Sequence, residues 1–282
     1  MKILTLNTHS LIEECYEEKL ISFVEMLKIE QPDVIALQEV NQSLSMPKAQ
    51  DVCATGYVAC PDCDVVVRMD NHAYRVAKLL LDAGLLYQWT WVSSKVGYDV
   101  YDEGIAIFSK CAIVNMEQFY ISTIQDYNNW KSRKILGICT GNMWFYSVHM
   151  GWWDDEEEPF AKQWDVFLQR LKNREQTCFV MGDFNSPADK QNEGYDYVMR
   201  SGWMDTWKAA KDKDIGVTVG SVIDGWKDKV HADSMSEQRG MRIDFIFCSK
   251  AIPVESSKVV CNDVNYPVVS DHYGVLVEIL EL

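Results

Sequence analysis

Short apolar segments that end in acidic, amide or imidazole side chains recur along this chain. The most informative is Thr177–Met181, a run rich in β-forming residues that is followed by Gly-Asp-Phe-Asn-Ser-Pro at positions 182–187. We interpret the run as a buried strand, and the glycine and the Ser-Pro pair as marks of the turn after it. Asp183 and Asn185 would then lie at a strand-to-loop corner, where layered α/β proteins often place functional residues.

Other apolar segments carry polar residues in the same way. One near the N-terminus ends at Asn7, and the next carries Glu39. Close to the C-terminus, Asp244 lies inside a strand-like run, and Asp271 with His272 opens another. A single residue of this kind is usually a strand cap or a turn residue. Several of them at strand ends indicate one shared site, and their oxygen ligands suit a hard cation such as Mg²⁺.

Length and composition agree with one large core. The chain has 282 residues, 48% of them apolar, and no Pro/Gly/Ser-rich linker, repeat or low-complexity tract divides it. A chain of this size can bury roughly 75% of its unfolded surface. Because the polar strand ends are spread over the whole length, any cut would split the candidate site. We therefore predict a single domain over residues 1–282.

The acidic charge limits the class of partner. The net charge is −15, from 27 Lys and Arg against 42 Asp and Glu. Duplex DNA binding depends on basic residues that neutralise phosphates, so a long nucleic acid is a disfavoured partner unless a local basic patch overrides the average. The one compact basic run is 131–134. It is either a solvated strand start or, if Arg133 faces the site, a bidentate phosphate contact.

The first residues and the cysteines bear on location. Met1 leads directly into the first strand without a signal-peptide pattern, and no apolar run approaches the ~18 residues of a membrane span. We expect a cytoplasmic protein with no membrane or obligate protein partner. Cys60 and Cys63 form the only Cys-x-x-Cys among nine cysteines. We expect reduced loop thiols there rather than a zinc or redox site.

The order of predicted elements is typical of a layered α/β protein. A helix is expected over 13–30, between two strands, and residues 41–70 are expected to form a long loop over the site. Gly141 and Asn142 are typical of a hairpin turn. Two antiparallel sheets packed face to face with helices outside would fit this order. The remaining predicted helices are 73–83 and 160–171, and the remaining predicted strands are 87–96, 104–108, 113–120, 134–140, 143–150 and 275–280.

Taken together, the polar strand ends closely resemble those of the endonuclease/exonuclease/phosphatase superfamily, which includes DNase I-like nucleases, sphingomyelinases and inositol polyphosphate phosphatases. The resemblance extends from Asn7 to Gly274. It implies a four-layer α/β sandwich, with two packed, mostly antiparallel sheets flanked by helices. The loops, including residues 6–10 and 97–104, most resemble those of the bacterial maltose 6′-phosphate phosphatase branch.

The resemblance implies an Mg²⁺-dependent phosphoric ester hydrolase, with Mn²⁺ as an alternative metal. It assigns Asn7 and Glu39 to the metal, and Asp271 would complete the metal shell. These assignments agree with the residue types, since Mg²⁺ is commonly held by few carboxylates and keeps several waters.

The resemblance also implies catalytic roles. Asp183 would orient or deprotonate the attacking water, and Asn185 would donate to a phosphoryl oxygen. Asp244 would fix the tautomer of His272 and stabilise its protonated form. His149 would contact or protonate the transition-state phosphate.

Several titratable residues lie outside these motifs. Glu103 could orient His149, although the adjacent Asp102 competes because a strand turns only one of two neighbours inward. The remaining histidines show no matching pattern and are expected in surface or loop positions; they are His9, His72 and His231.

The loop after His149 suggests a substrate class. Trp152 and Trp153 precede five acidic residues at 154–158. The tryptophans would stack on a sugar ring and the acids would accept bonds from its hydroxyls; otherwise the tryptophans anchor the core. We therefore expect a phosphomonoesterase for a small phosphorylated sugar. The alternatives are a nuclease or other phosphodiesterase with the same site, and a non-catalytic signalling or binding protein of this fold.

Overall fold

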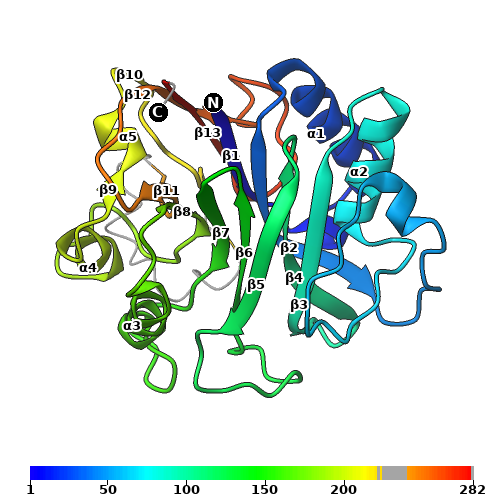
Figure 1. Cartoon of the computed structure of the whole chain (residues 1–282), viewed down its shortest axis with the longest axis horizontal. Coiled ribbons are helices and arrows are strands. Elements are labelled where there is room, and N and C mark those ends of the chain that lie inside the picture. Colours follow the sequence, from blue (N-terminus) through cyan, green and yellow to red (C-terminus); the bar gives the residue numbers. More distant parts are fainter. Residues whose placement is uncertain (221–222, 224–239, 281–282) are drawn as a thin grey trace.

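The structure is a computed structural model that describes residues 1–220, 223 and 240–280. Its strands form two sheets that pack face to face, and helices cover both outer faces (Figure 1). Within the described residues, one sheet has the order β10-β12-β13-β1-β2-β4-β3 and the other has the order β5-β6-β7-β8-β11-β9. Most pairs are antiparallel; β1 with β2, β7 with β8 and β10 with β12 are parallel. The expected four-layer α/β sandwich is confirmed.

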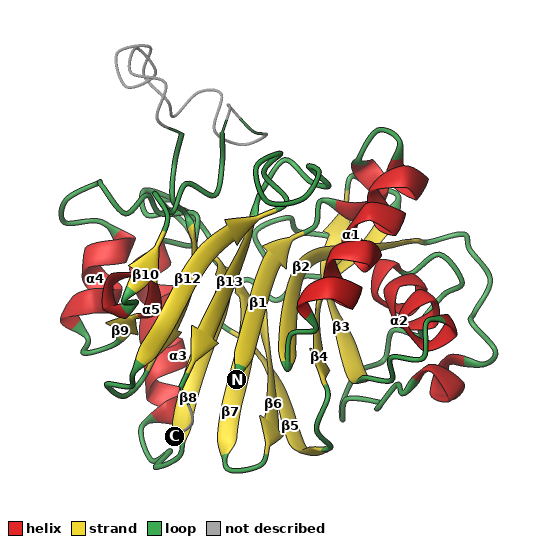
Figure 2. Cartoon of the chain, turned by 90° about the horizontal axis from the view of Figure 1, so that it is seen from above, coloured by secondary structure: helices red, strands yellow, loops and turns green. Residues whose placement is uncertain are grey.

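Figure 2 shows several strands of the first sheet side by side. That sheet contains β1 (Lys2–Asn7), β2 (Val34–Ser43), β3 (Gln88–Gly97), β4 (Tyr101–Ser109), β10 (Asp212–Lys213), β12 (Val254–Val260) and β13 (Gly274–Ile279). The second sheet contains β5 (Ile113–Tyr120), β6 (Lys134–Thr140), β7 (Met143–His149), β8 (Thr177–Asp183), β9 (Met204–Asp205) and β11 (Asp244–Cys248).

Helices complete the outer layers. The helices α1 (Tyr16–Glu30) and α2 (His72–Asp82) pack on the first sheet, and α3 (Phe160–Leu171) and α4 (Gly194–Arg200) pack on the second. The short α5 (Thr206–Ala209) contacts β11 and β12. Two 3₁₀ segments, η1 (Ser10–Ile12) and η2 (Val52–Thr55), lie in the described connections. No helix among the described residues has the length and apolar character that crossing a membrane requires, and the expected cytoplasmic location stays a prediction.

Burial on both faces explains the continuous apolar runs. In β8, Phe179 and Met181 enter the core between the sheets, whereas Cys178 and Val180 enter the core beneath α3. Side chains alternate along a strand, so a strand covered on both sides must be apolar at every position. The run Thr177–Met181 therefore carries the signal of a central strand.

The face between the sheets turns polar at one end. Gln38 of β2 bonds to Thr5 of β1 at 3.3 Å within its own sheet, and to Ser147 Oγ of the opposite sheet at 3.0 Å. These three side chains are fully buried. They form a polar layer between the apolar core and the ends of the strands, and the candidate site lies beyond it.

Most predicted elements agree with the structure, and the differences are local. The helix expected from residue 13 begins at Tyr16, because 3₁₀ structure and a turn precede it. The strand expected from residue 104 begins at Tyr101, so it includes Glu103. Strand β12 and the helix α4 were not predicted. Gly141 forms part of the turn between the antiparallel strands β6 and β7, as expected.

The segment 41–70 differs from its prediction. Its first residues extend β2 to Ser43, and Ala49 and Val67 are buried in the core that α1 and α2 cover. No residue of the segment lines the cavity described below. The prediction that it lies over the site is wrong. Its buried apolar side chains pack in the core between the first sheet and the helices α1 and α2.

The Cys-x-x-Cys motif lies in this segment. All nine cysteines are free, Cys60 is buried and Cys63 is partly buried. Burial raises the pKa of the Cys60 thiol to about 12. A thiol that stays protonated is a poor nucleophile and a poor metal ligand, which agrees with a structural role.

Candidate active site

Strand pairing brings three polar side chains into one row. β7 runs parallel to β8 with His149 opposite Asp183, and β11 runs antiparallel to β8 with Asp244 opposite Asp183. Because side chains alternate along a strand, Asp183 and Asp244 share a face with the core residues Met181 and Ile246. The row is therefore the polar end of the face between the sheets.

The glycine before Asp183 permits this close pairing. Gly182 has φ 144°, and a Cβ atom there would lie 2.0 Å from the carbonyl oxygen of Val148. Any side chain would push β8 away from β7 and disturb the register of Asp183 with His149. The glycine marked as a turn signal in the sequence is thus a residue of the strand itself.

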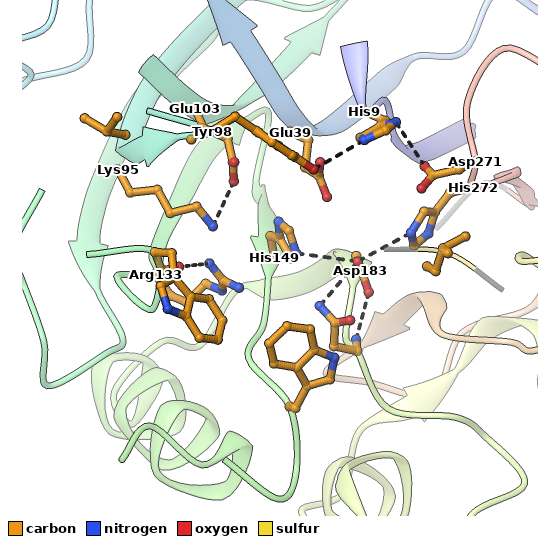
Figure 3. Close-up of a pocket in the computed structure, with 16 residues that line it drawn as sticks. His9, Glu39, Lys95, Tyr98, Glu103, Arg133, His149, Asp183, Asp271 and His272 are labelled. Atoms are coloured by element: carbon orange, nitrogen blue, oxygen red, sulfur yellow. Dashed lines mark hydrogen bonds and ion pairs between the residues drawn. The ribbon is translucent and has the colours of Figure 1, made fainter. Parts of the chain in front are cut away.

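Asp183 is the centre of the hydrogen-bond network. Its Oδ1 accepts from the backbone N–H of Asn185 at 2.8 Å, and its Oδ2 accepts from Asn7 Nδ2 at 3.1 Å. The Nε2 atoms of His149 and His272 lie 3.6 Å and 3.9 Å from Oδ2. Burial raises the pKa of the Asp183 carboxyl above its usual range, although His272 opposes this. The geometry makes Asp183 a candidate proton acceptor at the centre of the site (Figure 3).

Asp244 and His272 form a buried pair. His272 Nδ1 lies 2.9 Å from Asp244 Oδ2, and both side chains are almost fully buried. Burial alone would lower the pKa of His272, but the charge of Asp244 and the hydrogen bond to it outweigh burial and raise the pKa to about 10. His272 is therefore a cation at neutral pH with its other nitrogen toward Asp183, as the sequence motif led us to expect.

Removal of either member of this pair should have almost the same effect as removal of both. Asp244→Asn and His272→Ala are each expected to lower kcat/KM by about 10²- to 10³-fold, because each removes the charged form of His272. The double variant should be only slightly worse, since residues that act as a unit are not additive. A double-mutant cycle on kcat/KM tests this, and single losses that simply multiply would contradict it.

His149 has different surroundings from His272. Burial lowers the pKa of His149 well below its usual value, and the charges of Arg133, Lys95 and His272 lower it further. The expected partner does not orient it: Glu103 Oε1 forms an ion pair with Lys95 Nζ at 2.9 Å. Of the two alternatives, Glu103 and not Asp102 lines the cavity, but its carboxylate pairs with Lys95 of the neighbouring strand.

Glu39 reaches the site through a β-bulge. Regular alternation would turn it outward with Leu37, toward α1 and α2. The pairing of β2 with β4 shifts register between Leu37 and Val40, and Glu39 has φ 50°. The bulge re-aims its carboxylate inward, where Oε1 accepts from Asn7 Nδ2 at 2.9 Å.

The donor set fits a divalent cation. Ligand atoms of Glu39, His149 and Asp183 lie within 4.8 Å of one another. Burial and the charges of Glu103 and Asp271 raise the pKa of Glu39, so a bound cation would offset unfavourable charge. Asn7 presents its amide nitrogen to Glu39 and Asp183, and it could ligate a cation only through the oxygen of a reversed amide.

Asp271 lies in the same cavity but in a second group. Its Oδ1 is 3.8 Å from His9 Nδ1, and Glu13 Oε1 is 2.7 Å from the same nitrogen. In Figure 3, His9 lies between Glu39 and Asp271. Burial would lower the pKa of His9, but Glu13, Asp271 and Glu39 raise it to about 9. His9 lies in the loop between β1 and η1, as expected, but it is a cation among carboxylates at the cavity, a role the sequence did not indicate.

The other two unassigned histidines have different outcomes. His72 is buried and hydrogen-bonded to Tyr16, so the surface prediction is wrong for it. His231 lies outside the described residues.

The site opens into a cavity of about 270 Å³. Trp130 and Trp152 form part of its wall, with ring centroids 5.5 Å apart. Trp153 does not line it; this ring packs against Phe160 and Tyr197. The two tryptophans therefore divide between the alternatives that the sequence left open, since Trp152 lines the cavity and Trp153 packs against the core. Further lining residues include Tyr98, Lys95, Arg133 and Asn185.

The acidic loop does not face the cavity either. Lys131 Nζ bonds to Asp155 at 2.9 Å and to Glu157 at 2.8 Å. Glu158 is buried and accepts from the backbone N–H groups of Thr123 and Ile124. None of residues 154–158 lines the cavity. The prediction that these acids bind sugar hydroxyls is replaced by a role in holding the loop.

Comparison with known proteins shows the family of this chain. A model of the endonuclease/exonuclease/phosphatase family matches residues 4–272. The chain belongs to this family. Members of the family are phosphoric ester hydrolases that typically use divalent metals, and this chain is therefore an enzyme of that class. No match was found among curated proteins.

Solved structures of family members have the same fold. A family protein from Leptotrichia buccalis has 31% identity and a TM-score of 0.85, with both chains fully covered. A mannosyl-6-phosphatase from Bacteroides thetaiotaomicron has 16% identity and a TM-score of 0.65, again with 100% of each chain covered. A 3′ phosphatase from Neisseria bound to a product DNA hairpin has 17% identity and a TM-score of 0.64, with 100% of each chain covered.

Proposed function

We propose that this protein is an Mg²⁺-dependent phosphomonoesterase that releases phosphate from a small phosphorylated sugar. The observation that carries the proposal is the cavity. Its wall includes Asp183 and His149 as well as the rings of Trp130 and Trp152. Its volume of about 270 Å³ suits a small molecule rather than a polymer. The aromatic wall would cover the apolar face of a sugar while the phosphate lies against Asp183.

Each side chain of the site would have a separate role in hydrolysis of the phosphate ester. Bound Mg²⁺ would polarise a phosphoryl oxygen and neutralise part of its charge. Asp183, close to two histidines and two amides, would accept the proton of the attacking water. His272, kept protonated by Asp244, would stabilise negative charge that develops on the phosphoryl group. Asn185 lies beside Asp183 and would contact a phosphoryl oxygen.

Two further observations support a small sugar phosphate. The chain carries a net charge of −15, which disfavours a long polyanion. One protein of similar structure is a mannosyl-6-phosphatase, and the loops resemble those of the maltose 6′-phosphate phosphatase branch. A disaccharide or hexose phosphate is therefore the proposed substrate, with Mn²⁺ as a substitute metal.

A nuclease or DNA 3′ phosphatase is the second candidate. The 3′ phosphatase of similar structure that holds a DNA hairpin favours it. The two candidates differ in what the cavity must accept, since a DNA strand has to continue beyond the reacting phosphate whereas a sugar phosphate can end inside the cavity.

A substrate screen tests the proposal directly. With Mg²⁺ present, we expect phosphate release from a disaccharide or hexose phosphate and negligible nicking of plasmid DNA, even at low salt where charge repulsion is least screened. Phosphate release and gel mobility are the measurements. Efficient DNA cleavage with no turnover of any sugar phosphate would favour the second candidate.

Loss of a tryptophan from the cavity wall should raise KM for a sugar phosphate more than KM for an aryl phosphate. Trp130→Ala and Trp152→Ala are each expected to raise KM for the sugar phosphate about 3- to 10-fold. The KM for 4-nitrophenyl phosphate should change less, because this ester lacks a sugar ring. Trp153→Phe is the matched control, since it keeps an aromatic ring in the core and lies outside the cavity wall. Equal changes in both KM values would argue against a sugar platform.

A further inference from the structure

Two buried cationic side chains, Lys95 and Arg133, line the same cavity as Asp183 and His149. Lys95 comes from β3 and Arg133 from the residue before β6, and both line the cavity. They are 6% and 5% exposed. Figure 3 shows Lys95 and Arg133 on one side of His149 and Asp183, with His9 and Asp271 on the other. The cations are thus separate from the carboxylates that would hold a metal.

Lys95 forms an ion pair with Glu103. It pairs with Glu103 across β3 and β4, at a register shift between Ser93 and Lys95. The two side chains, each less than 10% exposed, meet at 2.9 Å. Burial and the charge of Arg133 lower the pKa of Lys95, and the ion pair with Glu103 opposes this shift. The pair therefore offsets part of the cost of burying the Lys95 ammonium at the cavity wall.

Arg133 has no such partner among the described residues. Its Nη1 donates to the carbonyl oxygen of Trp130 at 2.9 Å, and its Nε is buried without a hydrogen bond. No described carboxylate lies within ion-pair distance of it. Buried guanidinium groups are normally paired with anions, and their planar donors match phosphate oxygens. The side chain therefore has the properties of a receptor for an anion that enters the cavity.

Both cations act on the reaction centre. Their charges, together with burial, lower the pKa of His149. Burial lowers the pKa of Arg133, and the charges of the surrounding carboxylates Glu103, Glu39 and Asp183 oppose this shift. An anion in the cavity beside Asp183 and His149 would lie within reach of the field of both cations.

We propose that Lys95 and Arg133 bind the phosphoryl oxygens that carry the second negative charge of a phosphomonoester, and that they thereby select monoesters over diesters. This inference rests on the proposed phosphatase function of the same site. A phosphate monoester carries a charge of about −1.5 to −2 at pH 7. A diester carries a single negative charge and would place a second ester group against Lys95 and Arg133, so two desolvated cations would face only one negative charge.

The test compares phosphate binding with turnover of two artificial esters. Lys95→Met and Arg133→Gln are each expected to weaken inhibition by inorganic phosphate about 10- to 100-fold, and to lower kcat/KM for 4-nitrophenyl phosphate by a similar factor. The kcat/KM for bis(4-nitrophenyl) phosphate should fall less than threefold or should rise, because that diester does not use the second charge.

Matched variants separate specificity from loss of structure. Lys134→Gln removes a neighbouring positive charge outside the cavity and should change none of these values. The double variant Lys95→Met/Glu103→Gln removes the ion pair without leaving a lone buried carboxylate, and it should reproduce the effect of Lys95→Met. Arg133→Lys should recover part of the phosphate inhibition, since it restores charge without the planar donors.

The outcomes are distinguishable. Unchanged phosphate inhibition in Lys95→Met and Arg133→Gln would overturn the inference, and so would equal losses for the monoester and the diester. A wild-type enzyme that cleaves the diester faster than the monoester would instead contradict the proposed phosphomonoesterase function.

Discussion

Replacement of Asp183 by asparagine is expected to lower kcat by about 10²- to 10⁴-fold, the range for loss of a general base. Asp183 is the only described carboxylate that lies near both His149 and His272 and also accepts bonds from Asn7 and Asn185. The asparagine side chain has almost the same shape but cannot accept a proton at neutral pH. The row would keep its packing and lose its proton acceptor.

The same substitution should also reduce stability. Oδ1 and Oδ2 of Asp183 both accept from N–H groups, so either orientation of an amide would place its NH₂ group against a donor. We expect the free energy of unfolding to fall by about 1 to 3 kcal/mol. Kinetics under substrate saturation measure kcat, and thermal unfolding measures stability. A variant that keeps kcat within threefold of wild type would remove Asp183 from the chemistry.

Glu39→Gln is expected to raise the Mg²⁺ concentration needed for half-maximal activity by about 100-fold or more, because it removes a charged oxygen from the proposed metal site. At limiting Mg²⁺ most activity should be lost, and saturating Mg²⁺ should restore part of it. Chelation followed by Mg²⁺ titration gives this value. An unchanged titration curve would contradict the assignment of Glu39 to the metal.

A second readout does not depend on activity. Glu39 lies in the field of Glu103 and Asp271, so loss of its charge relieves repulsion in the metal-free protein. The metal-free variant should therefore unfold at the same temperature as wild type or higher, whereas Mg²⁺ should raise its Tm less than it raises that of wild type. Glu103→Gln removes a nearby charge without removing a proposed ligand, and it should leave most of the Mg²⁺-dependent rise in Tm.

The central row could be predicted from the sequence because each member lies on or beside a strongly apolar strand. Asp183, Asp244 and His149 occupy paired positions of three neighbouring strands, and strands of this kind have clear apolar signals. The two sheets and the main helices follow from the same signals. Strand β12 was missed because its sequence, Val-Glu-Ser-Ser-Lys-Val-Val, is polar at its centre, as expected for a strand near a sheet edge.

The cavity wall could not be predicted because it depends on local irregularities. Lys95 lies at a register shift, and the bulge that turns Glu39 inward depends on a residue with positive φ. Trp130 comes from a loop about twenty residues before Trp152, and only the fold brings the two rings together. Trp153 was assigned to the substrate because adjacent residues were treated alike, although their side chains point to different surroundings.

The sequence of the basic segment 131–134 predicted the position of only one of its residues. Arg133 was considered as a phosphate contact, and the structure places it in the cavity wall. Its neighbour Lys131 instead holds Asp155 and Glu157, so the acidic loop and the basic run neutralise each other. The sequence predicted that the acids of 154–158 face the substrate, whereas the structure places Lys95 and Arg133 at the cavity wall and none of these five acids.

The position of β1 has a consequence for the order of events during synthesis. β1 is paired on one side with β2 and on the other with β13, and the hydroxyl of Ser270 donates to the carbonyl of Asn7 at 2.8 Å. A growing polypeptide therefore has an open strand edge beside β1 until residues near 274–279 leave the ribosome. Such long-range pairing forms slowly and leaves edges exposed to aggregation. The nascent chain should need protection at this edge, and hydrolytic competence should appear only once β13 has been made.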